Sequence, residues 1–237
     1  GPSLVTLDGA DPTGESGTVT FFTDATRTVV ANTLTFTEIE NIIPCFTPGS
    51  LIATPMGEVP VERLREGDKI ITRDNGIQEI RWIGSRTLRR EDIARAPHLR
   101  PILIKAGSLG QGLPERDMLV SPQHRVLVAN DRTQLYFDES EVLVAAKHLV
   151  NSGSIQTLDT LRTTYIHFMF DRHEVVLSDG AWTESFQPGD QTLGAMGDQV
   201  RDEILSLFPE LATQEGLGDY TAARRSLKAH EARLLQL

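Results

Sequence analysis

The sequence has little cysteine: Cys45 is the only one among 237 residues. A lone thiol excludes an internal disulfide and a cysteine-rich metal site, so Cys45 is either a buried inert residue or a reactive nucleophile. The chain also lacks an excess of basic residues, because 23 Lys and Arg stand against 33 Asp and Glu, a formal net charge of −10. This balance argues against a surface for nucleic acid or for an anionic membrane. No apolar run is long enough to span a bilayer.

The six histidines do not form a recognised pattern of metal ligands. A zinc site needs His, Cys or carboxylate residues at characteristic spacings, and none is present here. Four of the histidines show no partner pattern of any kind, namely His98, His148, His167 and His230. We therefore expect neither a metal nor another cofactor.

The sequence of residues 1–44 indicates a short β segment. Gly17–Phe22 and Thr33–Thr37 alternate apolar and polar residues as strands do, and residues typical of turns surround them. Two or three strands without a core of their own would be marginally stable. We expect this segment to be the end of a longer β structure that lies upstream.

Residues 45–185 predict an all-β body with many short strands. Asp74-Asn75-Gly76 is typical of a hairpin turn between two of the strands. A single helical turn or a tight loop is expected at Pro60–Gly67, and short helices are expected at Glu91–Ala96 and Ala145–Val150. The expected strands are Leu51–Thr54, Asp68–Thr72, Ile77–Ile83, Arg100–Ile104, Arg125–Val128, Tyr165–Phe170 and Glu174–Ser178.

Residues 186–237 predict a helical C-terminal extension. Asp198–Phe208 carries apolar residues at helical spacing, with Asp198 as a cap. Tyr220–Leu235 is rich in Ala, Arg and Leu and is also expected to be helical.

The composition changes at Cys45 itself. A segment rich in Thr, Asp and Gly precedes it, and the strand-rich region comes after it. A nucleophile at such a junction can attack the peptide bond before it, Pro44–Cys45. The chain would then be its own substrate, with residues 1–44 as the part removed.

Two blocks of sequence resemble the Hint superfamily, which comprises inteins, hedgehog autoprocessing domains and bacterial intein-like domains. Cys45–Ser50 together with Val59–Asp68 resembles its opening block, and Ser121–Val126 resembles a later block with the pattern Thr-x-x-His. The resemblance covers roughly residues 45–185 and is greatest to the bacterial Hint proteins. It implies a horseshoe-shaped β fold that brings Cys45 and His124 together.

The residues of these blocks suit an acyl shift from nitrogen to sulfur. Cys45 can attack the Pro44 carbonyl through a five-membered ring and convert the amide to a thioester, and covalent attachment guarantees proximity. An imidazole such as that of His124 can protonate the leaving nitrogen near neutral pH. Ser121 can donate a hydrogen bond that holds or polarises the scissile amide. The thioester would then be open to water, to a small nucleophile or to an amine.

A late block supplies two further candidates, Asp171 and His173. The block resembles the part of the superfamily in which a histidine lies on a strand near the reaction centre. Two residues that are two apart on a strand share a face, so Asp171 could orient His173 or serve as a base. The alternative is a surface hairpin with charged residues.

Departures from the family favour cleavage over splicing. Inteins end in His-Asn, and the corresponding stretch here, Gly180–Ser185, contains neither residue. Hedgehog domains carry an aspartate that assists sterol attack, and the matching stretch Trp82–Arg86 offers no carboxylate. Pro44 has a fixed φ, which restricts the geometry of attack on its carbonyl.

Two other functions stay open at this point. The chain could be a Hint-shaped binding or structural module that does not process itself, with Cys45 and His124 as ordinary core residues. It could also pass the thioester to an amine of an acceptor protein. The stretch Phe36–Asn41 resembles the last turn of secreted calcium-binding repeat proteins, which implies a secreted bacterial protein.

Overall fold

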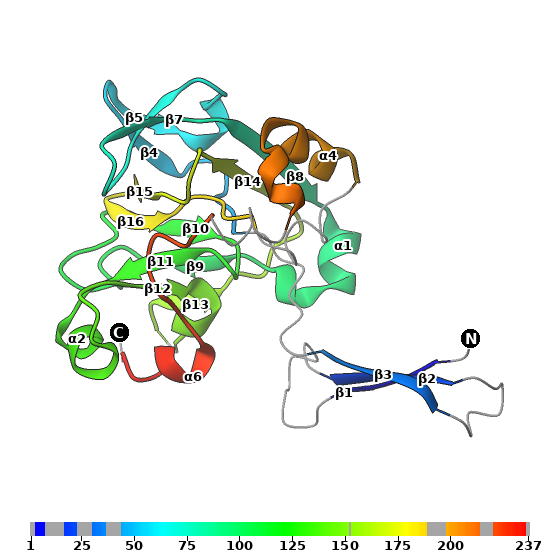
Figure 1. Ribbon diagram of the computed structural model, residues 1–237. Coiled ribbons are helices and arrows are strands. Elements are labelled where there is room, and N and C mark those ends of the chain that lie inside the picture. The colour runs from blue at the N-terminus through cyan, green and yellow to red at the C-terminus, as the bar shows by residue number, and fades with distance from the viewer. Residues whose placement is uncertain are drawn as a thin grey trace. The chain divides into compact units, whose positions relative to one another are not determined.

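The computed structural model describes residues 3–7, 17–22, 30–36, 44–151, 153–188, 198–213 and 220–235. The chain divides into two compact units, Gly1–Asn41 and Ile42–Leu237 (Figure 1). The expected helical extension therefore belongs to the same unit as the strand-rich region.

The first unit contains one antiparallel sheet in the order β1-β2-β3. Its strands are β1 (Ser3–Leu7), β2 (Gly17–Phe22) and β3 (Val30–Phe36). The two strands expected from the alternating pattern are confirmed as β2 and β3. The stretch that resembles calcium-binding repeats continues past Phe36 into residues outside the described ranges.

The second unit is built on a seven-stranded sheet in the order β17-β12-β11-β16-β15-β4-β5. Only the pairing of β12 with β17 is parallel. The strands are β4 (Leu51–Thr54), β5 (Gly57–Pro60), β11 (Arg125–Val128), β12 (Val142–Ala145), β15 (Val175–Ser178), β16 (Ala181–Glu184) and β17 (Ser226–Leu227).

Smaller sheets complete this unit. Three strands pair in the order β10-β9-β13, and two ribbons pair β8 with β14 and β6 with β7. These strands are β6 (Lys69–Ile71), β7 (Ile77–Glu79), β8 (Trp82–Leu88), β9 (Ile102–Ile104), β10 (Met118–Val120), β13 (Ile155–Thr157) and β14 (Thr163–Met169).

The described helices are short. Asn130 caps α2, because its side-chain oxygen accepts the N–H groups of Arg132 and Thr133. The α-helices are α1 (Arg90–Arg95), α2 (Asp131–Phe137), α4 (Asp198–Leu207) and α6 (Ala229–Ala232). The 3₁₀ turns are η1 (Val61–Arg63), η2 (Pro97–Leu99), η3 (Ala146–Leu149) and η4 (Pro209–Ala212).

Most expected strands are present, and one needs correction. The expected strand Ile77–Ile83 is two strands, because the chain changes partner within it. Ile80 N–H still donates to the carbonyl of Asp68 beside β6, whereas Arg81 N–H donates to the carbonyl of Met169 on β14. The Asn-Gly turn between β6 and β7 is confirmed, with Gly76 at φ +68°.

The expected helix at Tyr220–Leu235 is wrong in most of its length. Only Ala229–Ala232 is helical, and Ser226–Leu227 forms β17. The physical reason is that β12 offers an unpaired edge: Leu143 N–H donates to the carbonyl of Arg225, and the segment completes the sheet. The expected helix at Asp198–Phe208 is confirmed as α4.

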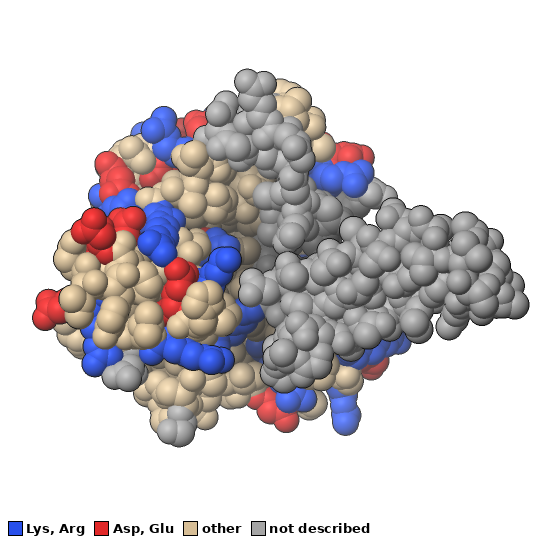
Figure 2. Space-filling model, turned by 60° about the horizontal axis from the view of Figure 1, so that its bottom comes forward, with Lys and Arg blue, Asp and Glu red and all other residues tan. Residues whose placement is uncertain are grey.

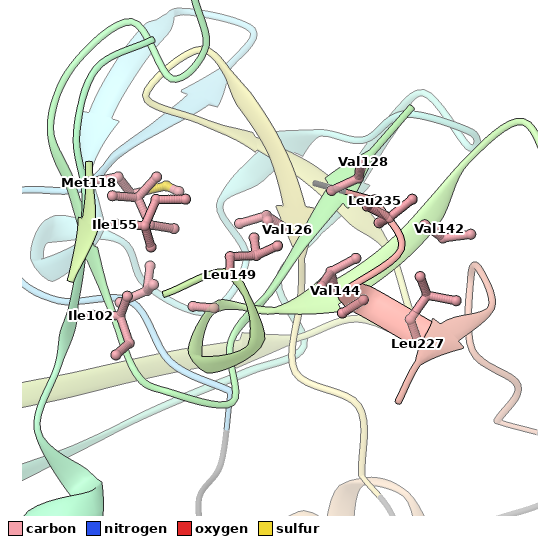
Figure 3. Packing of buried hydrophobic residues seen from close by; sticks show 14 of the residues in the cluster. Ile102, Met118, Val126, Val128, Val142, Val144, Leu149, Ile155, Leu227 and Leu235 are labelled. Atoms are coloured by element: carbon pink, nitrogen blue, oxygen red, sulfur yellow. The ribbon is translucent and has the colours of Figure 1, made fainter. Parts of the chain in front are cut away.

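The largest hydrophobic cluster joins the β10-β9-β13 sheet to β11 and β12, and it includes residues of the C-terminal segment (Figure 3). Leu227 and Leu235 pack beside Val128, Val142 and Val144. Both leucines are buried, and each such side chain contributes roughly 1.5–3 kcal/mol. Residues 220–235 are therefore part of the domain core.

A second contact of the C-terminal region is made by α4 and η4. Ile204, Phe208 and Leu211 pack against Trp82 of β8 and Phe186, which lies just after β16.

Acidic and basic side chains are mixed over the described surface that Figure 2 shows. Among the described residues, no helix is long and apolar enough to cross a membrane.

Candidate active site

The backbone of Phe46 fixes Cys45 between two segments that are far apart in sequence. Phe46 N–H donates to the Ile166 carbonyl over 2.8 Å, and Ile166 N–H donates back over 2.9 Å. On its other side, Phe46 bridges Val120 at the end of β10. The residues after Val120 and the residue after Ile166 are thereby brought to Cys45.

Ser121 contacts Cys45 through both its backbone and its side chain. Its N–H donates to the Cys45 carbonyl over 3.0 Å, and its Oγ accepts the N–H of Cys45 over 2.9 Å. That N–H belongs to the Pro44–Cys45 peptide bond, so Ser121 contacts the amide at which cleavage is expected. The hydroxyl accepts at this amide, where the sequence suggested that it donates.

The Cys45 side chain is buried, with 3% of its surface exposed. Burial raises the pKa of the thiol well above its ordinary value, against a smaller opposing effect of the hydrogen bond from Ser121. The thiol is therefore protonated at neutral pH. It needs a nearby group to accept its proton before sulfur can act as a nucleophile.

His124 lies beside Phe46 in the same buried region. Its backbone N–H donates to the Ser121 carbonyl over 3.0 Å. Its imidazole ring meets the Phe46 ring edge to face, with 4.5 Å between the ring centroids. Within the described part of the chain, neither ring nitrogen has a hydrogen-bond partner. Burial lowers the pKa of His124 to about 4, with Arg125 acting in the same direction and Glu184 opposing. Such an unpartnered buried histidine can bond a group that changes during a reaction.

His167 contacts the thiol directly, although no pattern in the sequence selects it. Its Nδ1 lies 3.3 Å from Cys45 Sγ. The ring is held between Trp82, at 5.0 Å between centroids, and Phe186, at 5.5 Å. Burial lowers the pKa of His167 to about 4, so the ring is neutral at neutral pH and can accept a proton.

Gly84 makes room for this arrangement. It lies opposite His167 in the pairing of β8 with β14. A Cβ at this position would lie 2.5 Å from Cη2 of Trp82 and 3.0 Å from Nε2 of His167. Glycine is therefore required for the indole and the imidazole to pack as they do. The stretch Trp82–Arg86 contains no carboxylate. Its contribution to the site is the packing of Trp82 and Gly84 against the His167 ring.

The two candidates of the late block lie in different surroundings. Asp171 is at the surface, with 71% of its side chain exposed, and pairs with Arg81 at 3.2 Å. His173 is buried at 3% exposure. The prediction that they share the face of a strand is wrong, because residues 171–174 precede β15 as a bend and an irregular stretch. The structure therefore places Asp171 outside the site.

Glu184 is a buried carboxylate that sequence reasoning did not select. Its Oε1 accepts the backbone N–H of Arg125 over 2.9 Å, and its Oε2 accepts the Arg125 guanidinium over 2.8 Å. His173 Nε2 lies 3.4 Å from Oε2. Burial acts to raise the pKa of Glu184, but Arg125 and His173 together hold it below its ordinary value. The group is therefore a charged carboxylate inside the domain.

The stretch Gly180–Ser185 does not end the domain. Ser185 is buried, its N–H donates to the Glu174 carbonyl over 2.8 Å, and its Oγ accepts the Glu174 N–H over 3.0 Å. Phe186 N–H then donates to the Phe168 carbonyl on β14. The chain thus continues from β16 alongside the strand that carries His167.

Among the described residues, no group of three His, Cys, Asp or Glu side chains could hold a metal ion.

Comparison with known proteins adds a family to this geometry. A sequence model described as the Hint domain matches residues 44–190, which is more than half of the chain. The match begins at Pro44 and includes Cys45, Ser121, His124, His167 and Glu184. A search of curated proteins finds no match to the sequence.

Several solved structures resemble the chain at low sequence identity. The bacterial intein-like domain from Clostridium thermocellum is 15% identical, with a TM-score of 0.39, and the alignment covers 60% of this chain and 97% of that one. The gp41-1 intein is 13% identical, with a TM-score of 0.37 and coverage of 59% and 97%. A DnaB intein from Synechocystis sp. PCC 6803 is 11% identical, with a TM-score of 0.37 and coverage of 60% and 98%.

Proposed function

The chain belongs to the Hint domain family, and from this premise we propose that it cleaves its own Pro44–Cys45 peptide bond through a thioester. A Hint fold points to self-processing or splicing as the class of activity. The observation that carries the finer proposal is the contact of Cys45 Sγ with Nδ1 of a neutral histidine at 3.3 Å, while the amide N–H of the same cysteine bonds Ser121.

The first step is attack of Cys45 sulfur on the Pro44 carbonyl carbon. The thiol proton passes to Nδ1 of His167 as the S–C bond forms. The C–N bond then breaks, and the Cys45 nitrogen takes a proton from the protonated form of His124. The products are a thioester between Pro44 and Cys45 Sγ and a free α-amine on Cys45. Exchange with solvent returns both histidines to their starting states.

Ser121 supports this step from the nitrogen side. Its hydroxyl accepts the N–H of Cys45 and holds the amide plane against the thiol. Rotation of a peptide bond costs about 18–20 kcal/mol because resonance is lost. Fixed positioning of sulfur, amide and histidines reduces the part of the barrier that comes from orientation. In the second step, water or a small nucleophile attacks the thioester carbonyl and releases residues 1–44 with Pro44 as the new terminus.

The segment at the end of β16 favours cleavage over splicing. Splicing in inteins requires a terminal His-Asn pair, and Gly180–Ser185 contains neither residue. Ser185 is instead buried with both of its backbone and side-chain bonds made to Glu174. The chain then continues into Phe186 and the segment that packs against Trp82. We therefore propose two products, 1–44 and 45–237.

One observation favours the non-processing alternative. The Cys45 thiol is buried and its pKa is raised by that burial, which is the environment of an inert core cysteine. A chain of this kind would use the same fold as a binding or structural module. Passage of the thioester to an amine of an acceptor protein is a variant of the cleavage proposal, with a different second nucleophile.

The test is an intact-mass time course on a fusion with a second protein placed after Leu237. The proposal predicts one cut at Pro44–Cys45 and faster release on addition of a small thiol. Joining of residues 1–44 to the second protein would contradict it and establish splicing. A single unchanged mass with and without thiol would establish the non-processing module.

A further inference from the structure

The carboxylate of Glu184 holds the peptide bond that links His124 to Arg125. The N–H of this peptide donates to Oε1 over 2.9 Å, and the Arg125 guanidinium donates to Oε2 over 2.8 Å. Both bonds are charge-assisted and therefore stronger than bonds between neutral groups. Glu184 is 1% exposed, so water does not compete for them. The backbone position of His124 thus depends on a side chain from β16.

His173 connects this carboxylate to the C-terminal segment. Its Nδ1 accepts the N–H of Ala223 over 3.0 Å, so Nδ1 carries no proton in this arrangement. The ring proton of the neutral tautomer is then on Nε2, which lies 3.4 Å from Oε2 of Glu184, a close contact and not a formed hydrogen bond. Ala223 therefore determines which nitrogen of His173 presents a proton to Glu184.

Ala223 is itself fixed by contacts on both sides. Tyr220 is buried and its hydroxyl donates to the Phe170 carbonyl over 2.9 Å. Arg224 pairs with Asp74 at 2.7 Å and with Glu141 at 2.9 Å. Leu227 lies further along the segment, in the hydrophobic cluster that includes β12. Residues 220–227 therefore hold the Ala223 N–H in place from several elements of the domain.

The charge of Glu184 also acts on the two groups that exchange protons in the proposed reaction. It contacts Arg125 on β11 and His173 before β15, and its charge also acts on His124 and on the thiol of Cys45. Its negative charge opposes the lowering of the His124 pKa that burial causes, and it adds to the raised pKa of the thiol. Glu184 therefore favours the imidazolium form of His124, which is the form that donates a proton.

From these contacts we infer that Glu184 is the positioning residue of the site, and that residues 220–227 hold it in place through Ala223 and His173. The inference rests on the proposed self-cleavage, because it assigns Glu184 an effect on His124 as proton donor. The C-terminal segment then acts on the proposed site through His173, whose Nδ1 accepts the Ala223 N–H.

The first test compares Glu184→Gln with Glu184→Asp. Glutamine keeps the shape but removes the charge, and we expect cleavage at neutral pH to slow roughly 10-fold, because the imidazolium form of His124 becomes rarer. Aspartate keeps the charge and should recover part of the loss. Equal rates for the native chain and Glu184→Gln would overturn the inference while leaving self-cleavage intact.

The second test does not depend on cleavage. In a Cys45→Ala background, NMR follows the protonation of the six histidines against pH, with His124 assigned from a His124→Gln spectrum. Glu184→Gln should move the midpoint of His124 to lower pH. An unchanged midpoint would overturn the inference even if the proposed function has failed on other grounds.

The third test separates the two nitrogens of His173. Glutamine places an N–H donor near the position of Nε2, and asparagine places an acceptor near the position of Nδ1. The inference predicts that His173→Gln cleaves faster than His173→Asn. It also predicts that the protonation midpoint of His124 shifts less in His173→Gln than in His173→Asn. The reverse order, with equal thermal stability of the two variants, would contradict the proposed role of Nε2 as the group that faces Glu184.

Discussion

His124 and His167 are both buried in the domain core, yet the structure gives them different partners. Both are buried, and burial lowers the pKa of each to about 4. His167 contacts the thiol and is enclosed by Trp82 and Phe186, whereas neither ring nitrogen of His124 has a partner among the described residues. Burial alone therefore does not assign a role. The proposed roles instead rest on the contacts of the ring nitrogens: Nδ1 of His167 meets the thiol, whereas both nitrogens of His124 are open to the proposed proton transfer.

The largest effect is expected at Cys45, the proposed nucleophile. Cys45→Ala removes the only thiol and should abolish fragmentation at Pro44–Cys45, because no other group can form the thioester. Mass spectrometry of the purified variant over days measures this, with thermal unfolding as the control for the fold. Continued fragmentation at the same bond would show that the thioester is not the intermediate.

His124→Ala tests the donor side of the comparison. Loss of a general acid should slow cleavage about 10²–10⁴-fold. The measurement is a gel time course at matched concentration, with circular dichroism to confirm folding. His98→Ala is a suitable control, because the His98 side chain is exposed. A rate equal to that of the native chain would return His124 to the role of a core histidine.

His167→Ala tests the acceptor side. We expect a loss of about 10²-fold or more, because the thiol is left buried without a group to take its proton. Gly84→Ala should give a smaller loss, since the added Cβ meets Trp82 and the His167 ring. Rates come from the same gel assay. If His167→Ala cleaves normally while His124→Ala does not, the two histidines do not divide the proton transfers as proposed.

The pH dependence sharpens the same comparison. The protonated form of His124 grows as pH falls from 8 to 5, because its pKa is about 4, and His167 stays neutral in this range because its pKa is also about 4. Cleavage should therefore accelerate as pH falls, by up to about 10-fold per unit. A flat profile, with circular dichroism unchanged at pH 5, would indicate that the proton moves internally from sulfur to nitrogen.

The smallest effect on cleavage is expected from a substitution in the core contact of residues 220–235, which should instead change the stability of the fold. Leu235→Ala should lower the free energy of unfolding by about 2–5 kcal/mol, because the side chain is 1% exposed within the main cluster. Leu234→Ala, at 44% exposure, is the matched control and should change stability little. Denaturant titration compares them. Equal stabilities would mean that residues 220–235 do not contribute to the core as described.

The sequence predicts the part of the site that is carried by local blocks. Cys45, Ser121 and His124 lie in two short stretches with a recognisable pattern, and the structure brings all three together. The mainly β fold and strands such as β4 and β11 also derive from local alternation and turns. These features depend on neighbours in sequence, which is the information that a pattern contains.

The remaining part of the site depends on pairing between distant segments. His167 reaches the thiol because β14 pairs with both Phe46 and β8, and no local signal reports that pairing. The one hint in the sequence is a histidine within an apolar strand, Tyr165–Phe170. Glu184 and β17 escape prediction for the same reason, since each is defined by a partner on another strand. Asp171 lies outside the site because residues 171–174 are a bend and an irregular stretch before β15, so Asp171 and His173 do not share the face of a strand.

The most direct test of the central claim is capture of the thioester with hydroxylamine. Hydroxylamine attacks a thioester far faster than an amide, so treated protein should yield residues 45–237 with a free Cys45 amine. Residues 1–44 should carry a hydroxamate on Pro44. The Cys45→Ala variant, treated in parallel, should stay intact. Recovery of the native chain at its full mass, with no hydroxamate on Pro44, would contradict cleavage through a thioester.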